Sequence, residues 1–419
     1  MIVAARRVVT SVTCLSRLSA LALCVSLGCA ASGRPEPIAP PSTELHGGAR
    51  AAQRQGASAR DAVMLAATRW VEAGARFRGV GPWLGADSAY SVDLHDGRVL
   101  WLFGDTFIDP ARDGSRTNGP NVFLRNSVAL QTAAPGSAGA AGHNLSRSEL
   151  QFFTGPERSG AATSFFPETS DGDWFWPLHG FRLEHGPLLL FRMRVSKVDT
   201  GFGFKVTGWD AVAVDDPDAA PDTWTLRAVA GQPRGADRLL GASVMRHDDQ
   251  LYVYAVRNSD DDHAVYVARI ALAELRGLTS HAFSDPEWFT ARGYERLSTG
   301  ATPVAIIPDG QIELSVHYEP QLRRFVEIQT RGLFVSEPAT AVVWRTSPLP
   351  EGPWSEARVL WKPAAPAGAD ATKLLAYAAK AHPEQLGPGL MVTYMENDVS
   401  HPVPMDAVYY PEVLRVKVE

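Results

Sequence analysis

The sequence predicts an all-β fold, arranged as a five-bladed β-propeller. From about residue 76 to the end, short runs rich in β-branched and aromatic residues alternate with Gly, Pro, Asn and Asp. Helical periodicity is almost absent over the same length. The runs also form five groups, spaced roughly 60 to 80 residues apart, as expected for radial repetition of small sheets. These groups begin near Gly85, Trp176, Gly241, Ser315 and Ala379.

Residues 1–29 have the pattern of a bacterial signal peptide. Arg6, Arg7 and Arg17 precede an apolar run, residues 18–28, that is too short to span a bilayer as a helix. The run ends in Ser-Leu-Gly-Cys29, which resembles a lipobox, so Cys29 is expected to be lipidated and to become the mature N-terminus. Ser26 stands where Leu or Val is usual, and ordinary cleavage nearby stays open as an alternative.

The cysteines support an exported protein without thiol chemistry. The chain has three, Cys14, Cys24 and Cys29, and all lie in the N-terminal segment. The mature domain therefore has no disulfide, cysteine nucleophile or thiolate metal site. We expect a lipoprotein at the cell envelope, attached to the membrane through its lipid anchor only.

The rest of the chain divides into a tether and one domain. Residues 30–75 are rich in Ala, Gly, Pro and Ser and predict a flexible tether, with a short helix possible over Asp61 to Ala75. Residues 76–419 form the predicted propeller domain. A net charge of -6 and 45% hydrophobic residues give material for a core and no basic excess for nucleic acid. We expect a monomer.

The segment from Gly85 to Thr106 is the strongest candidate for a functional site. An Asp-Gly turn, residues 95–98, joins two β-rich runs and predicts a hairpin. Asp87 and Asp105 would then meet at the end of the hairpin away from the turn. Neighbouring carboxylates push their pKa values apart, which suits acid/base chemistry on a sugar or ester linkage. Gly104 indicates that something approaches the backbone closely there.

Two further stretches carry candidate site residues. The segment 168–177 combines carboxylates and flat aromatic rings, the combination that binds sugars; its candidates are Glu168, Asp173, Trp174 and Trp176. Asn126 begins a strand shortly after Asp105 and is a candidate hydrogen-bond donor to the aspartate pair. A turn at residues 171–173, inter-blade packing of the tryptophans and a strand cap at Asn126 are the structural alternatives.

The first strand of each blade lines a propeller's channel, so five residues are expected to converge on the axis: Asp87, His179, Ser243, His317 and His382. The three histidines suggest a metal, but their separations match no local metal motif. Calcium at Asp260–Asp262 is possible but unsupported, because the spacing lacks the pattern of a calcium loop. No metal or cofactor is expected. Serine-nucleophile and phosphate-loop motifs are absent from the sequence.

Six motifs together resemble a known group of propeller domains. They are Gly-Ala-Asp87-Ser, Leu-Trp-Leu-Phe-Gly-Asp105-Thr-Phe, Arg-Asn126-Ser, Trp-Phe-Trp176-Pro, Arg345-Thr-Ser-Pro with Gly352-Pro-Trp-Ser, and Tyr377-Ala-Ala-Lys-Ala-His382-Pro. The sequence is similar, from about residue 76 to the end, to five-bladed propeller domains long described as of unknown function. One branch of that group is glycoside hydrolase family 183, the endo-D-arabinanases. The first-blade motif is fairly specific, whereas the fifth motif is common to many five-bladed sugar-active propellers and indicates the fold alone.

The resemblance implies a glycosidase site at the channel mouth, with Asp87 and Asp105 as catalytic acids. The chain departs from the pattern at His179, where such domains often have an acid after the Trp-Pro element. Glu168 or Asp173 would then supply the proton donor, and His179, His317 and His382 would help to bind substrate.

Three hypotheses follow. The leading one is an exported, lipid-anchored glycoside hydrolase acting on a furanosyl polysaccharide such as an arabinan. Its stereochemical course depends on a carboxylate separation that a sequence does not give. The second is a catalytically inactive, carbohydrate-binding surface lipoprotein. The third is a structural propeller that binds a protein partner.

Overall fold

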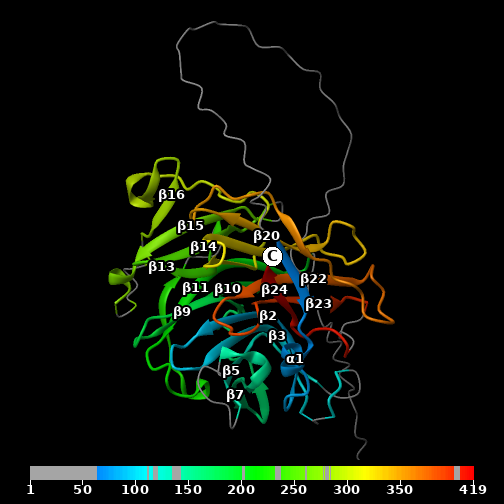
Figure 1. Cartoon of the computed structure of the whole chain (residues 1–419). Helices are drawn as coiled ribbons and strands as arrows, with labels where there is room; N and C mark the ends of the chain where they lie inside the picture. Colours follow the sequence, from blue (N-terminus) through cyan, green and yellow to red (C-terminus); the bar gives the residue numbers. More distant parts are fainter. Residues whose placement is uncertain are drawn as a thin grey trace, which may run out of the picture.

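A computed structural model describes residues 64–110, 113–116, 121–134, 143–200, 203–231, 237–259, 262–276, 278, 283, 285–400 and 406–419. Five antiparallel sheets are arranged in a ring, which confirms the predicted all-β, five-bladed propeller (Figure 1). The innermost strands of neighbouring sheets contact one another around the ring. Within the described residues, no helix is long and apolar enough to cross a membrane.

Each blade runs outward from its innermost strand. The first consists of β2 (Trp83–Asp93), β3 (Val99–Ile108), β5 (Ser127–Ala133) and β6 (Ser148–Phe153), with β4 (Val122–Leu124) also paired to β3. The second consists of β9 (Trp174–Arg182), β10 (Leu188–Lys197), β11 (Phe204–Val214) and β12 (Leu226–Gly231). The third consists of β13 (Arg238–His247), β14 (Gln250–Arg257), β15 (Val265–Ala271), β16 (Glu287–Thr290) and β17 (Gly293–Arg296).

The fourth blade consists of β18 (Leu314–Glu319), β19 (Arg324–Arg331), β20 (Ala341–Ser347) and β21 (Arg358–Trp361). The fifth consists of β22 (Leu374–His382), β23 (Leu390–Asp398), β24 (Glu412–Val418) and β1 (Leu65–Arg69). Outside the ring, β7 (Gly155–Arg158) pairs with β8 (Ala161–Thr163). The described helical segments are the short α1 (Val71–Gly74) and single 3₁₀ turns.

The ring is closed by the two ends of the described chain. Strand β1 pairs antiparallel with β24, from Leu65 opposite Val418 to Arg69 opposite Leu414. Residues 65–69 therefore form a strand where a helix was possible, whereas Val71–Gly74 in the same stretch is helical as α1. The propeller includes β1 and so begins before residue 76, and residues 61–63 lie outside the described residues. Residues 65–69 form a strand and not a helix because β24 satisfies their backbone hydrogen bonds. Leu65 and Ala67 also pack on the core that includes the fifth blade.

Side chains on the innermost strands tie each blade to the next. Val244 N donates to His179 Nδ1 (2.9 Å), Val316 N donates to Ser243 Oγ (2.9 Å), and Ala381 N donates to Ser315 Oγ (2.8 Å). His382 Nδ1 and Ser91 Oγ join the fifth and first blades, and His179 Nε2 bonds to Ser91 O (3.0 Å) between the first and second. The predicted convergence of the innermost strands on the channel is therefore confirmed, and these polar groups hold the ring together.

Candidate functional site

The predicted hairpin forms and places both aspartates at its open end. Strands β2 and β3 pair antiparallel, with Ala86 opposite Thr106 and Ser88 opposite Phe103. The pairing shifts register three times between Trp83 and Tyr90, and Ser88 adopts a left-handed φ of 69°. Such bulges redirect side chains at the ends of strands. Here the irregular stretch brings the Asp87 carboxylate against Gly104, next to Asp105.

Asp105 is a buried carboxylate with two partners. Its side chain accepts a hydrogen bond from Trp176 Nε1 (2.8 Å), and Arg125 Nη1 lies 3.7 Å from Oδ2. Burial raises the pKa of Asp105 to about 6, although the Arg125 charge and the Trp176 hydrogen bond oppose that rise. At pH 7 this carboxylate is therefore mostly ionised.

Asp87 is more accessible and holds its proton more tightly. Its side chain is half-buried, and Tyr377 Oη donates to Oδ2 at 3.3 Å. Burial first, and then the negative charges of Asp105 and Glu313, raise the pKa of Asp87 well above its ordinary value. The Tyr377 hydrogen bond and the Lys380 charge oppose this shift.

The third carboxylate near the pair is Glu313, which the sequence analysis missed. Glu313 lies directly before β18 and is 7% exposed. It accepts a 2.8 Å hydrogen bond from Nζ of Lys380, which is 1% exposed on β22. A lysine within the alanine-rich run 378–381 was the available signal, because lysine is almost never fully buried unless it is paired.

The two acids predicted as proton donors occupy other places. Asp173 is 3% exposed, and its carboxylate is held by Arg194 (2.9 Å) and Ser196 (2.6 Å) of β10. Glu168 is exposed on the segment that precedes β9. Asp173 is thus engaged within its own blade and Glu168 faces solvent, whereas Glu313 is the acid whose charge acts on Asp87.

Asn126 has a structural role in place of the predicted hydrogen bond to the aspartate pair. The residue is fully buried, and its amide donates to the backbone oxygens of Phe166 (3.2 Å) and Phe175 (2.8 Å). Its Oδ1 accepts from Phe166 N at 2.6 Å. These bonds connect the first blade to the entry of the second and leave the amide buried within the protein.

The two predicted sugar-binding tryptophans differ in exposure. Trp174 is only 4% exposed, and the Arg125 guanidinium lies over its ring, 4.1 Å from the centroid. Trp176 is half-buried and bonded to Asp105. Trp176 therefore remains a candidate for contact with a ligand, whereas Trp174 supports Arg125 from behind.

The three histidines predicted to bind substrate lie on the innermost strands, where His317 and His382 are buried and His179 is partly buried. His179 bonds to Ser91 O (3.0 Å) and Val244 N, and His382 bonds to Ser91 and Thr393. Burial lowers the pKa of His179 and of His317 to about 4. Both ring nitrogens of His317 are without a hydrogen-bond partner in the described part of the chain.

Metal sites are not supported within the described residues, where no three His, Cys, Asp or Glu side chains could hold an ion. The calcium alternative concerned Asp260–Asp262. Asp260 and Asp261 lie outside the described residues, and Asp262 binds Arg257 at 2.6 Å.

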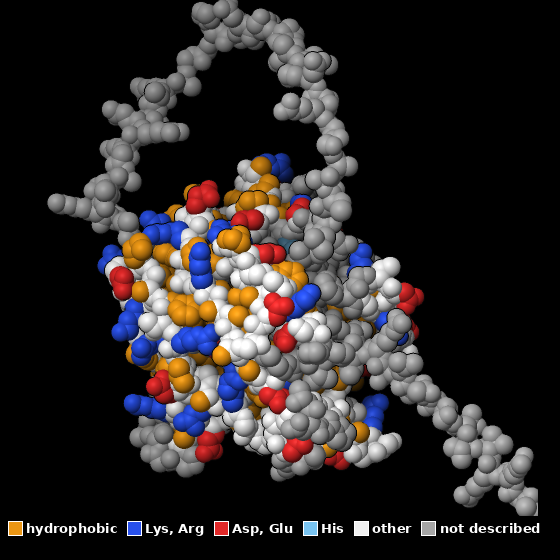
Figure 2. All heavy atoms as spheres, turned by 90° about the vertical axis from the view of Figure 1, so that its right-hand side faces the viewer, with side chains coloured by type: hydrophobic (Ala, Val, Ile, Leu, Met, Phe, Trp, Pro, Cys, Tyr) orange, Lys and Arg blue, Asp and Glu red, His pale blue; other side chains and the backbone are white. Residues whose placement is uncertain are grey.

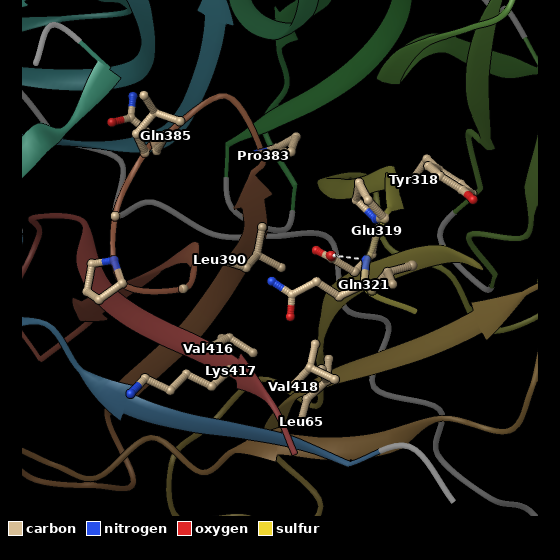
Figure 3. A pocket seen from close by; sticks show the side chains of 16 residues that line it. Leu65, Tyr318, Glu319, Gln321, Pro383, Gln385, Leu390, Val416, Lys417 and Val418 are labelled. Atoms are coloured by element: carbon tan, nitrogen blue, oxygen red, sulfur yellow. Dashed lines mark hydrogen bonds between the residues drawn. The ribbon is translucent and has the colours of Figure 1, made fainter. Parts of the chain in front are cut away.

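Two recesses lie near the C-terminal ends of the innermost strands, and Tyr318 and Pro383 line both of them. A cavity of about 270 Å³ is lined by Ser91, His179, His317 and Glu384 among others. A groove of about 570 Å³ lies between the fourth and fifth blades, where the Gln321 side chain extends toward Leu390, Val416 and Val418 (Figure 3). Acidic and basic side chains are interspersed among the coloured residues of the face in Figure 2.

Comparison with solved structures supports the fold. A Bacteroides ovatus protein provisionally described as a hydrolase is 18% identical, with a TM-score of 0.60; the match covers 84% of this chain and 90% of that chain. The endo-arabinase of Bacteroides thetaiotaomicron is 14% identical, with a TM-score of 0.41 and coverages of 80% and 95%. The first similarity shows a shared propeller fold.

Sequence comparison identifies the family. No curated protein matches the chain. The family model described as "Domain of unknown function (DUF5005)" matches residues 75–402, which is most of the propeller. This match agrees with the resemblance to propeller domains of unknown function and does not single out the family 183 branch. The chain belongs to the DUF5005 family.

Proposed function

We propose that the protein is a glycoside hydrolase whose reacting groups are Asp87 and Asp105. The observation that carries the proposal is the unequal environment of these neighbouring carboxylates. The pKa of Asp87 is raised well above its ordinary value, whereas that of Asp105 is raised only to about 6. Near neutral pH one group carries a proton and the other a charge, as glycoside hydrolysis requires.

The proposed reaction assigns one task to each carboxyl group. Asp87, the more exposed, donates its proton to the leaving glycosidic oxygen as the bond from that oxygen to the anomeric carbon breaks. Asp105 supplies the negative charge that stabilises the developing oxocarbenium ion, as nucleophile or as base toward water. The exposed part of the Trp176 ring offers an apolar face to a sugar.

The proposed substrate is a furanosyl polysaccharide such as an arabinan. Its support is the resemblance of the Asp87, Asp105 and Trp176 motifs to those of family 183. A third carboxylate, Glu313, acts on Asp87, and this grouping of acids favours an enzyme over a protein that only binds sugar.

The test is release of reducing ends from a panel of arabinans and other furanosyl polysaccharides, with binding measured in parallel. Hydrolysis of one class supports the proposal and names the substrate. Binding without hydrolysis, lost on replacement of Trp176 by Ala, would identify a sugar-binding protein instead.

We further propose that the protein is exported and anchored through Cys29. The support is the signal-like residues 1–28 and the absence of cysteine after position 29. Mass spectrometry of the native protein is expected to find a lipid-modified Cys29 at the N-terminus. An intact N-terminus with unmodified Cys29 would contradict the anchor.

A further inference from the structure

Glu313 and Lys380 form a buried ion pair, and the charges of both residues act on Asp87. Lys380 Nζ donates to Glu313 Oε1 at 2.8 Å and to Ala378 O at 3.0 Å. The same ammonium lies 4.2 Å from the centroid of the Tyr90 ring, within the range of a cation–π contact. An ammonium has three N–H groups. Two of them are engaged in hydrogen bonds, and the Tyr90 ring lies against the same ammonium.

The chain brings this pair to the site from two different blades. Glu313 precedes β18, and the bulge between Tyr377 and Lys380 in β22 turns the lysine inward, with Ala378 at a left-handed φ of 57°. The same bulged strand supplies Tyr377, which donates to Asp87. Lysine and acid are thus held next to the reacting carboxyl group by backbone that a regular strand does not provide.

The Lys380 charge already opposes the rise of the Asp87 pKa, and without Glu313 nothing would offset that charge. A cation close to a carboxyl group favours the ionised form and lowers its pKa, typically by about 1 to 3 units. Glu313 has the opposite effect on Asp87, because a neighbouring negative charge disfavours ionisation. Glu313 therefore keeps the pKa of Asp87 high in two ways. Its negative charge disfavours ionisation of Asp87, and its carboxylate pairs with Lys380.

We propose that Glu313 is a positioning residue that binds Lys380 so that Asp87 retains a transferable proton. Its catalytic meaning rests on the proposed hydrolase function, in which Asp87 is the proton donor. Glu313 itself acts through Asp87 and Lys380, and it is given no contact with substrate.

The test compares three full-length variants with the parent protein. Glu313→Gln keeps the shape of the side chain and removes its charge. Glu313→Gln/Lys380→Met removes both charges. The matched control is Glu327→Gln, because Glu327 lies in the same blade, is fully buried and is paired at 2.8 Å with Arg345.

The first readout is the titration midpoint of the Asp87 carboxyl group, followed by infrared spectroscopy and assigned by its loss in Asp87→Asn. Glu313→Gln is expected to lower the midpoint by about one pH unit or more. The double variant is expected to return toward the parent value, and Glu327→Gln is expected to leave it unchanged. An unchanged midpoint in Glu313→Gln would overturn the proposal. A midpoint in the double variant as low as that expected for Glu313→Gln would also overturn it. The double variant buries no unpaired lysine or glutamate, so it can be measured even if the single variant does not fold.

The second readout is the pH profile of kcat on the substrate identified above. Its basic limb is expected to move to lower pH in Glu313→Gln and back in the double variant, whereas a purely structural pair would lower kcat without moving the limb. If the parent shows no hydrolysis, the proposed function fails, and the infrared titration still decides the role of Glu313.

Discussion

Gly104 provides the space that the Asp87 carboxylate occupies. A Cβ atom at position 104 would lie 2.3 Å from Asp87 Oδ1, far closer than a non-bonded contact allows. Gly104→Ala is therefore expected to displace Asp87 and to lower kcat by at least about 100-fold, since a small misplacement of a reacting group can cost that much. Steady-state kinetics of the purified variant measures the effect.

The matched control is Gly74→Ala, where the new Cβ would meet Val413 Cγ2 at an ordinary 3.8 Å. This variant is expected to keep parental kinetics. Full activity in Gly104→Ala would show that the position of Asp87 does not matter to the chemistry.

Arg125 is expected to set the acidic limb of the pH profile. Its charge lowers the pKa of Asp105, which burial would otherwise raise above about 6. Arg125→Met removes the charge and keeps apolar packing on Trp174, so the pKa of Asp105 should rise and the acidic limb should move to higher pH. A profile of kcat/KM between pH 4 and pH 9 measures this. A limb that stays in place or moves to lower pH would mean that another group controls it.

His317 is expected to make folding stability sensitive to acid. Burial lowers its pKa from 6.5 to about 4, so protons bind the unfolded chain more readily than the folded one. The contribution of neutral His317 to the free energy of unfolding is complete above pH 6.5 and is lost as the pH falls toward 4. His317→Phe cannot titrate.

The comparison uses the free energy of unfolding of parent and His317→Phe at pH 7 and pH 4.5. The parent should lose about 2 to 3 kcal/mol more than the variant over this range. Equal losses would show that His317 is protonated equally well in the folded and unfolded chains.

Strand β1 is expected to be required for a stable ring. Deletion through Arg69 removes the strand that pairs with β24 and exposes that edge. We expect a loss on the order of 3 kcal/mol, since each backbone hydrogen bond contributes about 1 kcal/mol. Denaturant unfolding measures it, with deletion through Val63 as the control. Equal stability of the two truncations would contradict closure by β1.

The sequence was sufficient for features that depend on local pattern. The turn at residues 95–98 and the alternating runs around it specified the hairpin, and the hairpin alone brought Asp87 to Asp105. Gly104 indicated a close approach, and the structure shows that Asp87 is what approaches. The recurring groups specified the innermost strands and so the convergence of His179, His317 and His382.

Features that depend on contacts between distant segments could not be predicted in the same way. The local sequence of β1 is compatible with a helix. It forms a strand because it pairs with the edge of β24, about 350 residues later in the chain. Asn126 is a polar residue of the type found in binding sites. Only the fold shows that its amide donates hydrogen bonds to the backbone oxygens of Phe166 and Phe175. Glu313 and Lys380 are 67 residues apart, and their pairing exists only because the fourth and fifth blades are neighbours.

The most direct test of the account is hydrolysis of the identified polysaccharide by Asp87→Asn and Asp105→Asn, compared with Glu168→Gln. All three exchanges replace a carboxyl group by an amide and preserve side-chain shape. Folding is checked by thermal unfolding and polysaccharide binding. The account predicts at least about 1,000-fold loss of kcat in the two aspartate variants and near-parental activity in Glu168→Gln. Full activity of Asp87→Asn, or loss of activity in Glu168→Gln alone, would contradict the assignment of the site.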